Sequence, residues 1–272
     1  MSLLTVLFYR VILFLEFNSM FPFLAFVLFV VSVVLHELGH ALQMRAYGIE
    51  IEEFGIGYPT RLPSFKIPIR WFGQRVNLAF HPLLLAAYVQ ISEKGEDALE
   101  KLEYIDEEAD INGAGVIANI IFCAFCIGVS GILTGRWVTV GVSLLIGLVC
   151  WKGRKILSRI ILPLLSVPLI IGTTYLLSKD PGSFGGPVAI VQFIREFVVT
   201  LPDAFVMGGA ISLSLALTNC LPIAQLDIGK TVLQHIDYEN ERLGDLYVKA
   251  SSVIFPLMLI GAVVSDIIRL MR

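Results

Sequence analysis

The chain has 272 residues, of which 56% are hydrophobic and only 16% are charged, and its mean hydropathy is +0.81. This composition departs far from that of a soluble globular domain and predicts a multi-pass membrane protein. The formal net charge of -3 leaves no excess of basic residues to neutralise phosphates, so a nucleic-acid binder is excluded and the expected surroundings are a lipid bilayer.

Apolar stretches of about 20 residues predict about six transmembrane helices. Before them, residues 2–17 are hydrophobic but contain Arg10 and Glu16, which favours a membrane or interfacial helix at the N-terminus. The expected spans are residues 21–46, 113–133, 137–151, 156–177, 204–221 and 249–268. The fold class is therefore an all-α polytopic membrane protein.

A small amphipathic sheet is expected in the polar stretch that follows the first span. Apolar residues there alternate with polar ones, a period of two that is typical of strands lying on an apolar surface. Two or three short strands at the membrane interface are predicted from Phe65, Ile67, Ile69 and Trp71, followed by Val76, Leu78 and Phe80. The acidic stretch 93–110 is expected to form a solvated helix.

The most informative motif is His36-Glu37-Leu38-Gly39-His40, near the end of the first span. On a helix the two histidines stack on one face and can bind one Zn²⁺ at about 2.0 to 2.1 Å. Glu37 is rotated by about 100° and can act as a base on water. The alternative is a chance pair of surface histidines, but ionisable groups inside membrane segments are usually functional.

A third zinc ligand is expected from a later span that ends on the same side of the membrane. The span 204–221 fits, because Pro222 should end its helix and Asp227 then follows at a depth comparable to that of the histidines. The alternative is an ordinary loop aspartate. Basic residues gather on this side, including Lys152, Arg154 and Lys155, so the positive-inside rule predicts that it is cytoplasmic.

Together the two motifs resemble the site-2 protease family of intramembrane zinc metalloproteases. The resemblance rests on His36-Glu37-Leu38-Gly39-His40 and on Asn219 and Pro222 preceding Asp227, and further segments agree with it. These are residues 46–57, 87–90, 114–119 and 185–188. The chain is expected to be a short form of this family, without the PDZ domain that many relatives insert and without a CBS domain.

The resemblance implies a zinc endopeptidase that hydrolyses peptide bonds in or near transmembrane segments. It assigns His36, His40 and Asp227 to Zn²⁺, Glu37 to catalysis, and Asn119 or Asn219 to the substrate. The alternative for each asparagine is an interhelical hydrogen bond. The implied partners are single-span membrane proteins, cut for regulated intramembrane proteolysis or for clearance of signal remnants. The expected location is the cell inner membrane, and the oligomeric state stays open.

The expected organisation is one membrane-embedded peptidase domain over residues 1–272. Its parts are an N-terminal segment (1–19), the zinc helix (20–47), an interfacial β region with the acidic helix (48–112), and a membrane core (113–222) that carries an inserted hairpin (137–177). A cytoplasmic segment (223–248) and a C-terminal transmembrane helix (249–272) complete the chain.

Three residues depart from the family pattern, namely Ile228, Val116 and Ala86. If position 228 requires positive φ, a β-branched residue is strained there by roughly 1 to 3 kcal/mol and displaces the site. A catalytically weak or inactive pseudoprotease that binds transmembrane clients is therefore an alternative. A second alternative is a different membrane zinc protease with Glu196 as the third ligand.

Overall fold

A computed structural model describes residues 20–58, 64–71, 73–100, 102, 105–179 and 187–271. The expected N-terminal helix at 2–17 and the segment around Gly185 and Gly186 lie outside the described residues. In the described part of the chain, five helical stretches are long and apolar enough to cross a membrane, beside a four-stranded sheet. The prediction of an all-α membrane protein with a small sheet is thus confirmed.

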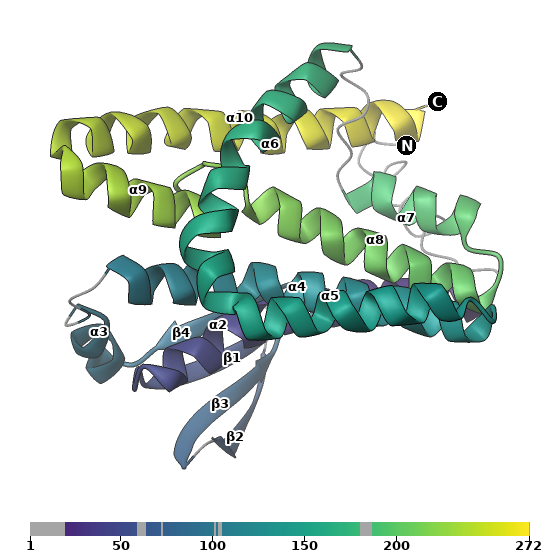
Figure 1. Cartoon of the computed structure of the whole chain (residues 1–272), viewed down its shortest axis with the longest axis horizontal. Helices are drawn as coiled ribbons and strands as arrows, with labels where there is room; N and C mark the ends of the chain where they lie inside the picture. Colours follow the sequence, from purple (N-terminus) through teal and green to yellow (C-terminus); the bar gives the residue numbers. More distant parts are fainter. Residues whose placement is uncertain are drawn as a thin grey trace, which may run out of the picture.

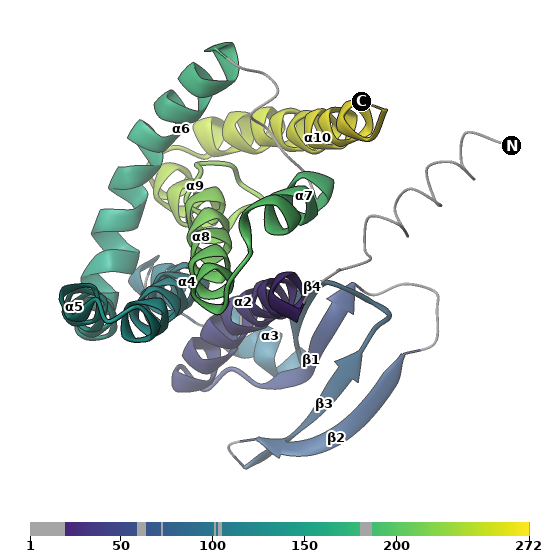
Figure 2. The same cartoon turned by 90° about the vertical axis from the view of Figure 1, so that its right-hand side faces the viewer.

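The bundle has four helices that run side by side (Figure 1). They are α2 (Met20–Ala46), α4 (Ile105–Leu133), α5 (Trp137–Ile156) and α8 (Leu201–Asn219). Helix α4 packs against the other three, and Figure 2 shows the bundle nearly end on. Because all four helices are apolar around most of their circumference, they bury some residues inside the bundle and leave others to the membrane.

The spans expected at 137–151 and 156–177 are joined without a break. A π-helical segment, η1 (Leu157–Ile161), connects α5 to α6 (Leu162–Lys179), and the connection expected at 152–155 is helical. Helix α6 leaves the bundle at η1 and runs across its direction (Figure 1). The bend coincides with the π segment and with Pro163 just beyond it, two known causes of helix kinks.

Three further helices are described, of which the last is long and apolar enough to cross a membrane. They are α7 (Pro187–Phe197), α9 (Asp227–Glu239) and α10 (Glu241–Met271), and α10 packs against α9. Helix α8 begins with a capping box between Thr200 and Asp203. It ends at Asn219, so the helix end predicted at Pro222 is confirmed.

The sheet contains more strands than the two or three expected. They are β1 (Ile51–Tyr58), β2 (Phe65–Trp71), β3 (Gln74–Phe80) and β4 (Leu83–Ile91), in the order β2-β3-β1-β4. Strand β1 pairs parallel with β3 and antiparallel with β4. The alternation of apolar and polar residues in the sequence predicted β2 and β3. It did not predict β1 and β4, because buried Gly55 and the apolar run at 83–87 interrupt the period of two.

The sheet lies against the zinc helix predicted from the motif. Ile51, Phe54 and Val76 form one apolar cluster with Ala41 of α2, and Figure 2 shows α2 lying over the strands. The acidic stretch forms two helices instead of one, because α3 (Glu93–Glu100) ends before α4 begins at Ile105. Asp110 is consequently part of a membrane helix, and its carboxylate binds Arg159.

A buried polar network joins three strands of the sheet. Glu53 on β1 contacts the Lys66 ammonium and accepts a hydrogen bond of 2.5 Å from the Tyr88 hydroxyl, which also lies 2.9 Å from His81 Nε2. Burial opposes ionisation of Glu53, but the bonds from Lys66 and Tyr88 outweigh it and lower its pKa. Burial and the bond to Glu53 raise the pKa of Tyr88 to about 12.

We expect Glu53→Gln to weaken the pairing of β1 with β4 by about 1 to 3 kcal/mol, because it removes the charge from a buried hydrogen bond. Since the folded pKa of Glu53 is lowered, its contribution is complete above its ordinary value of 4.5 and is lost as the pH falls through the lower folded value. Hydrogen exchange of the β1 and β4 amides measures this, with exposed Glu52→Gln as the control. Equal exchange in both variants would contradict the assignment.

Candidate metal centre

The two motif histidines lie on one face of α2 and turn their rings inward. His36 and His40 are 8% and 7% exposed, and their Nε2 atoms are 3.2 Å apart. Both residues sit in the second half of a 27-residue apolar helix, so few water molecules are available to solvate them. The spacing of one helical turn therefore produces the convergent pair that the sequence predicted.

Asp227 joins this pair from the other end of the chain. After α8 ends, a series of turns leads to α9, and Asp227 occupies the first turn of that helix. Its Oδ2 lies 2.9 Å from His36 Nε2 and 3.2 Å from His40 Nε2. Burial opposes ionisation of the carboxyl, but the two imidazoles outweigh it and hold the pKa of Asp227 well below its usual range.

The three donor atoms are arranged as the ligands of a small tetrahedral ion. Ligand atoms at about 2.0 to 2.1 Å from a tetrahedral centre are separated by about 3.3 Å, and the observed separations are 2.9, 3.2 and 3.2 Å. Two imidazole nitrogens and one carboxylate oxygen form a donor set suited to zinc, with a fourth position left for water. The residues therefore fit a catalytic metal site.

The backbone of α4 fixes the orientation of His40. The His40 Nδ1–H donates a hydrogen bond of 2.7 Å to the carbonyl of Ile111. With the proton on Nδ1, the lone pair of Nε2 faces Asp227 and His36, where an ion would sit. This contact sets the tautomer that metal binding requires.

Asn119 of α4 contacts His36 Nδ1, as the Ile111 carbonyl contacts His40 Nδ1. It is fully buried, its Nδ2 atom lies 3.1 Å from His36 Nδ1, and the Ser32 hydroxyl is 3.4 Å from its Oδ1. The two ends of a side-chain amide have the same shape, so the amide oxygen can turn to accept the His36 Nδ1–H when Nε2 binds an ion. Asn119 thus forms interhelical hydrogen bonds that support a ligand, and its contact with substrate stays a prediction.

Comparison with known protein families agrees with this geometry. The model of peptidase family M50 matches residues 24–262. The chain belongs to peptidase family M50, the site-2 protease family. It is thus a membrane metallopeptidase, as the converging donor atoms indicate. A search of curated proteins finds no significant match.

For this M50 member, loss of the Asn119 amide should lower metal affinity roughly 10- to 100-fold, the usual effect of removing a group that orients a ligand. We expect Asn119→Ala to lose zinc to a competing chelator at lower chelator concentrations than the parent protein. Asn119→Asp restores an acceptor for His36 and should regain most of the affinity. If both variants held zinc as tightly as the parent, Asn119 would have no such role.

Gly115 is a site residue whose role the sequence did not reveal. A Cβ atom added there would overlap His40 Nε2 and would lie 2.8 Å from His36 Nε2. Only a glycine on this face of α4 leaves room for an ion beside the two imidazoles. The signal was available, because Gly115 belongs to the Ala114–Asn119 segment that resembles the family, but no spacing rule ties it to the metal.

The remaining predicted site residues differ in their surroundings. Glu37 is partly exposed and interacts electrostatically with His36, His40 and Asp227, as expected for a base at the site. Asn219 donates a hydrogen bond of 3.1 Å to the carbonyl of Leu215 in its own helix. Its contact with substrate stays a prediction.

The alternative third ligand is not supported by the structure. Glu196 is exposed on α7 and accepts a hydrogen bond of 3.0 Å from Gln192. Among the described residues, the group that can hold a metal consists of His36, His40 and Asp227.

Ile228 causes none of the strain that its sequence position suggested. It lies in the first turn of α9, where φ is negative, and its fully buried side chain packs with Val116 and Cys220. A glycine is required instead at position 229, because a Cβ atom on Gly229 would overlap the backbone of Ile223. Asp227 therefore reaches the histidines without displacement.

Proposed function

We propose that the chain is a zinc endopeptidase that cuts single-span membrane proteins within or near their transmembrane segments. One observation carries the proposal: His36, His40 and Asp227 converge inside a bundle of apolar helices, and Glu37 lies beside them. Asp227 and the basic last turn of α5 both lie beside the first half of α4, so the positive-inside rule supports a cytoplasmic position for the site.

The chemistry divides between the ion and the protein. A bound Zn²⁺ supplies Lewis acidity for the scissile carbonyl and acidifies a water molecule. The Glu37 carboxylate accepts the proton of the attacking water and then donates it to the leaving amine nitrogen. Ile111 holds His40 in the required tautomer, Asn119 does so for His36 once its amide oxygen faces Nδ1, and the buried position of the site limits access of bulk water.

The sheet offers a way to present the substrate. A peptide bond inside a helix is shielded by its own hydrogen bonds, and an unpaired backbone in lipid costs several kcal/mol per group. Edge strands can replace those bonds, and the edges of the described sheet are β2 and β4. Pro68 lacks an N–H on β2, whereas β4 also contacts the zinc helix, so β4 is the better edge for an unwound substrate.

A cleavage assay with purified protein tests the proposal. The full chain is reconstituted with zinc in proteoliposomes together with a panel of tagged single-span proteins, and mass spectrometry locates each cut. We expect cleavage within or next to a transmembrane segment, loss of cleavage after chelation, and recovery when zinc is restored. Stoichiometric zinc binding without cleavage of any panel member would favour the client-binding pseudoprotease.

A further inference from the structure

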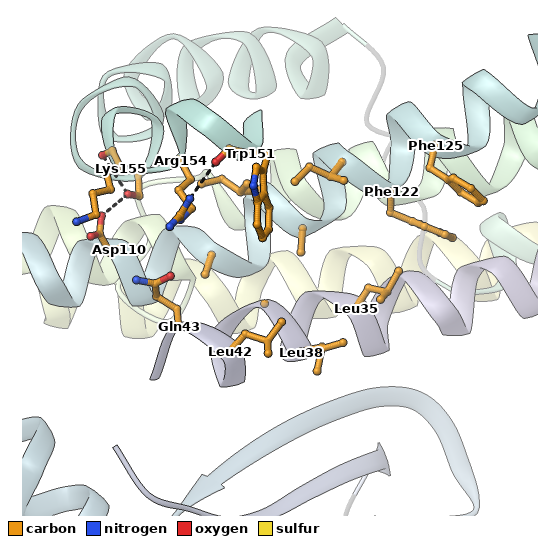
Figure 3. Close-up of a pocket in the computed structure, with 16 residues that line it drawn as sticks. Leu35, Leu38, Leu42, Gln43, Asp110, Phe122, Phe125, Trp151, Arg154 and Lys155 are labelled. Atoms are coloured by element: carbon orange, nitrogen blue, oxygen red, sulfur yellow. Dashed lines mark hydrogen bonds between the residues drawn. The ribbon is translucent and has the colours of Figure 1, made fainter. Parts of the chain in front are cut away.

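A cavity lies in the bundle on another face of the zinc helix. It has a volume of about 570 Å³ and is bordered by α2, α4 and α5 (Figure 3). On α2 its wall is formed by Leu35, Leu38 and Leu42, which lie on a different side of the helix from His36 and His40. Gly39 of α2 and Ala114 of α4 also line the cavity and approach each other closely, since a Cβ added to Gly39 would lie 2.6 Å from the Ala114 carbonyl oxygen.

The two ends of this cavity differ in chemistry. Figure 3 shows Arg154, Lys155 and Asp110 at one end and Phe122 and Phe125 at the other. Arg154 donates a hydrogen bond of 3.1 Å to the Trp151 carbonyl, and its guanidinium lies 5.4 Å from the centre of the Trp151 ring. The cavity is therefore cationic and aromatic at its mouth and apolar along its length.

The positive charge at the mouth is not cancelled by Asp110. Its carboxylate already accepts hydrogen bonds from Arg159 at 2.6 and 2.9 Å, from Ser158 at 2.7 Å and from Tyr47 at 2.6 Å. Arg159 balances this carboxylate and also pairs with Asp106. Arg154, Lys155 and Arg159 together outnumber the carboxylates of Asp106 and Asp110 by one positive charge, and the Arg154 and Lys155 side chains are exposed.

The dimensions match one acyl chain of a lipid better than a protein helix. A helix about 10 to 12 Å wide occupies roughly 100 Å³ per ångström of its length, so this volume would hold only about one turn of a substrate helix. From Asp110 to Phe125 the cavity follows α4 for 15 residues, or about 22 Å. This is close to the depth of one leaflet with its headgroup, since the hydrocarbon core is about 30 Å thick and the whole bilayer about 40 to 45 Å.

The position of the charges in the membrane agrees with this occupant. Trp151, Arg154 and Lys155 lie near the end of the α5 span, and tryptophan and basic residues are typical of the level of the lipid headgroups. Trp151, Phe125 and Leu42 are 60%, 57% and 43% exposed, so the rim is open to surrounding lipid. Basic pockets between transmembrane helices are suited to anionic headgroups.

We propose that this cavity binds one anionic glycerophospholipid. Its phosphate lies between Arg154 and Lys155, and one acyl chain follows α4 past Leu42 and Leu38 to Phe122 and Phe125. The inference is independent of the proteolytic function, because none of these residues belongs to the metal centre.

Native mass spectrometry of the purified full chain tests this site. The protein is titrated with phosphatidylglycerol or with phosphatidylcholine of the same acyl chains, and retained lipid is counted. We expect one phosphatidylglycerol to be retained in preference to phosphatidylcholine. Arg154→Gln/Lys155→Gln should lower the affinity for phosphatidylglycerol roughly 30-fold, because each basic group near the surface contributes about a fivefold effect.

Two further variants make the result specific. Lys152→Gln/Lys249→Gln removes two exposed charges outside the lining of the cavity and should retain the lipid. Leu42→Trp fills the apolar part without changing charge and should lower retention. The proposal is overturned if phosphatidylcholine is held equally well, if the control pair loses as much lipid as Arg154→Gln/Lys155→Gln, or if a transmembrane peptide occupies the cavity in place of lipid.

Discussion

Replacing Gly115 with alanine should abolish metal binding while leaving the fold intact. The added methyl group would overlap His40 Nε2 and would stand 2.8 Å from His36 Nε2, in the space that an ion needs. His40 can move away only by giving up its bond to the Ile111 carbonyl. We therefore expect the loss of zinc affinity to exceed the roughly 10- to 100-fold change that follows loss of a supporting hydrogen bond.

The fold should tolerate this change, because alanine is favoured over glycine inside a helix by up to about 1 kcal/mol. Gly128→Ala is the matched control: it lies on the same helix, and an added Cβ would meet its nearest neighbour, Ser143, at an ordinary 3.4 Å. Metal content by elemental analysis and helix content by circular dichroism are measured on both variants. A Gly115→Ala protein with one tightly held zinc would refute the assigned position of the ion.

Replacing Glu37 with glutamine should separate metal binding from catalysis. Glu37 is next to His36 in the sequence, and its carboxylate interacts electrostatically with both histidines and with Asp227. It is not one of the three converging donors. Glutamine keeps the size of the side chain and cannot accept the proton of water. We expect cleavage to fall about 10²- to 10⁴-fold, the usual contribution of a general base, while zinc content stays at one per chain.

The comparison with Asp227→Ala identifies the cause of that loss. Asp227 contacts both imidazoles, so its removal should release zinc and abolish activity together. Both variants are assayed on the substrate that the panel identifies, with zinc measured on the same samples. Unchanged cleavage by Glu37→Gln would exclude this carboxylate as the base, and unchanged zinc in Asp227→Ala would exclude it as a ligand.

Local patterns predicted the parts of the metal centre that depend on helix geometry. The spacing of His36 and His40 fixes both rings on one face of any helix, whatever surrounds it. The choice of Asp227 needed one more step, namely that the span before Pro222 runs in the same direction as the zinc helix. Helix direction can be read from the order of the spans, and so a contact across 187 residues was predictable.

The supporting groups were not predictable in the same way. For Asn119 both a contact with substrate and an interhelical hydrogen bond were open, because an amide in a membrane helix gives no sign of which neighbour it meets, and its contact with His36 depends on the rotation of α4. The prediction of strain at Ile228 was wrong for a related reason. The family glycine suggested positive φ at that position, but α9 begins at Asp227 and places Ile228 in ordinary helical geometry within the core.

By itself the sequence determined the membrane class, most of the spans, and the identity of the three converging donors, since each depends on composition, on helical period or on the direction of the spans. Tertiary structure alone decided that Gly115 and the Ile111 carbonyl complete the site, that α5 and α6 form one bent helical path, and that a cavity with a cationic mouth lies between α2, α4 and α5. The physical reason is that helices apolar around most of their surface can pack in many rotations of similar hydrophobic energy. Which rotation is adopted depends on close contacts between distant residues, such as Gly39 against Ala114, that no periodicity records.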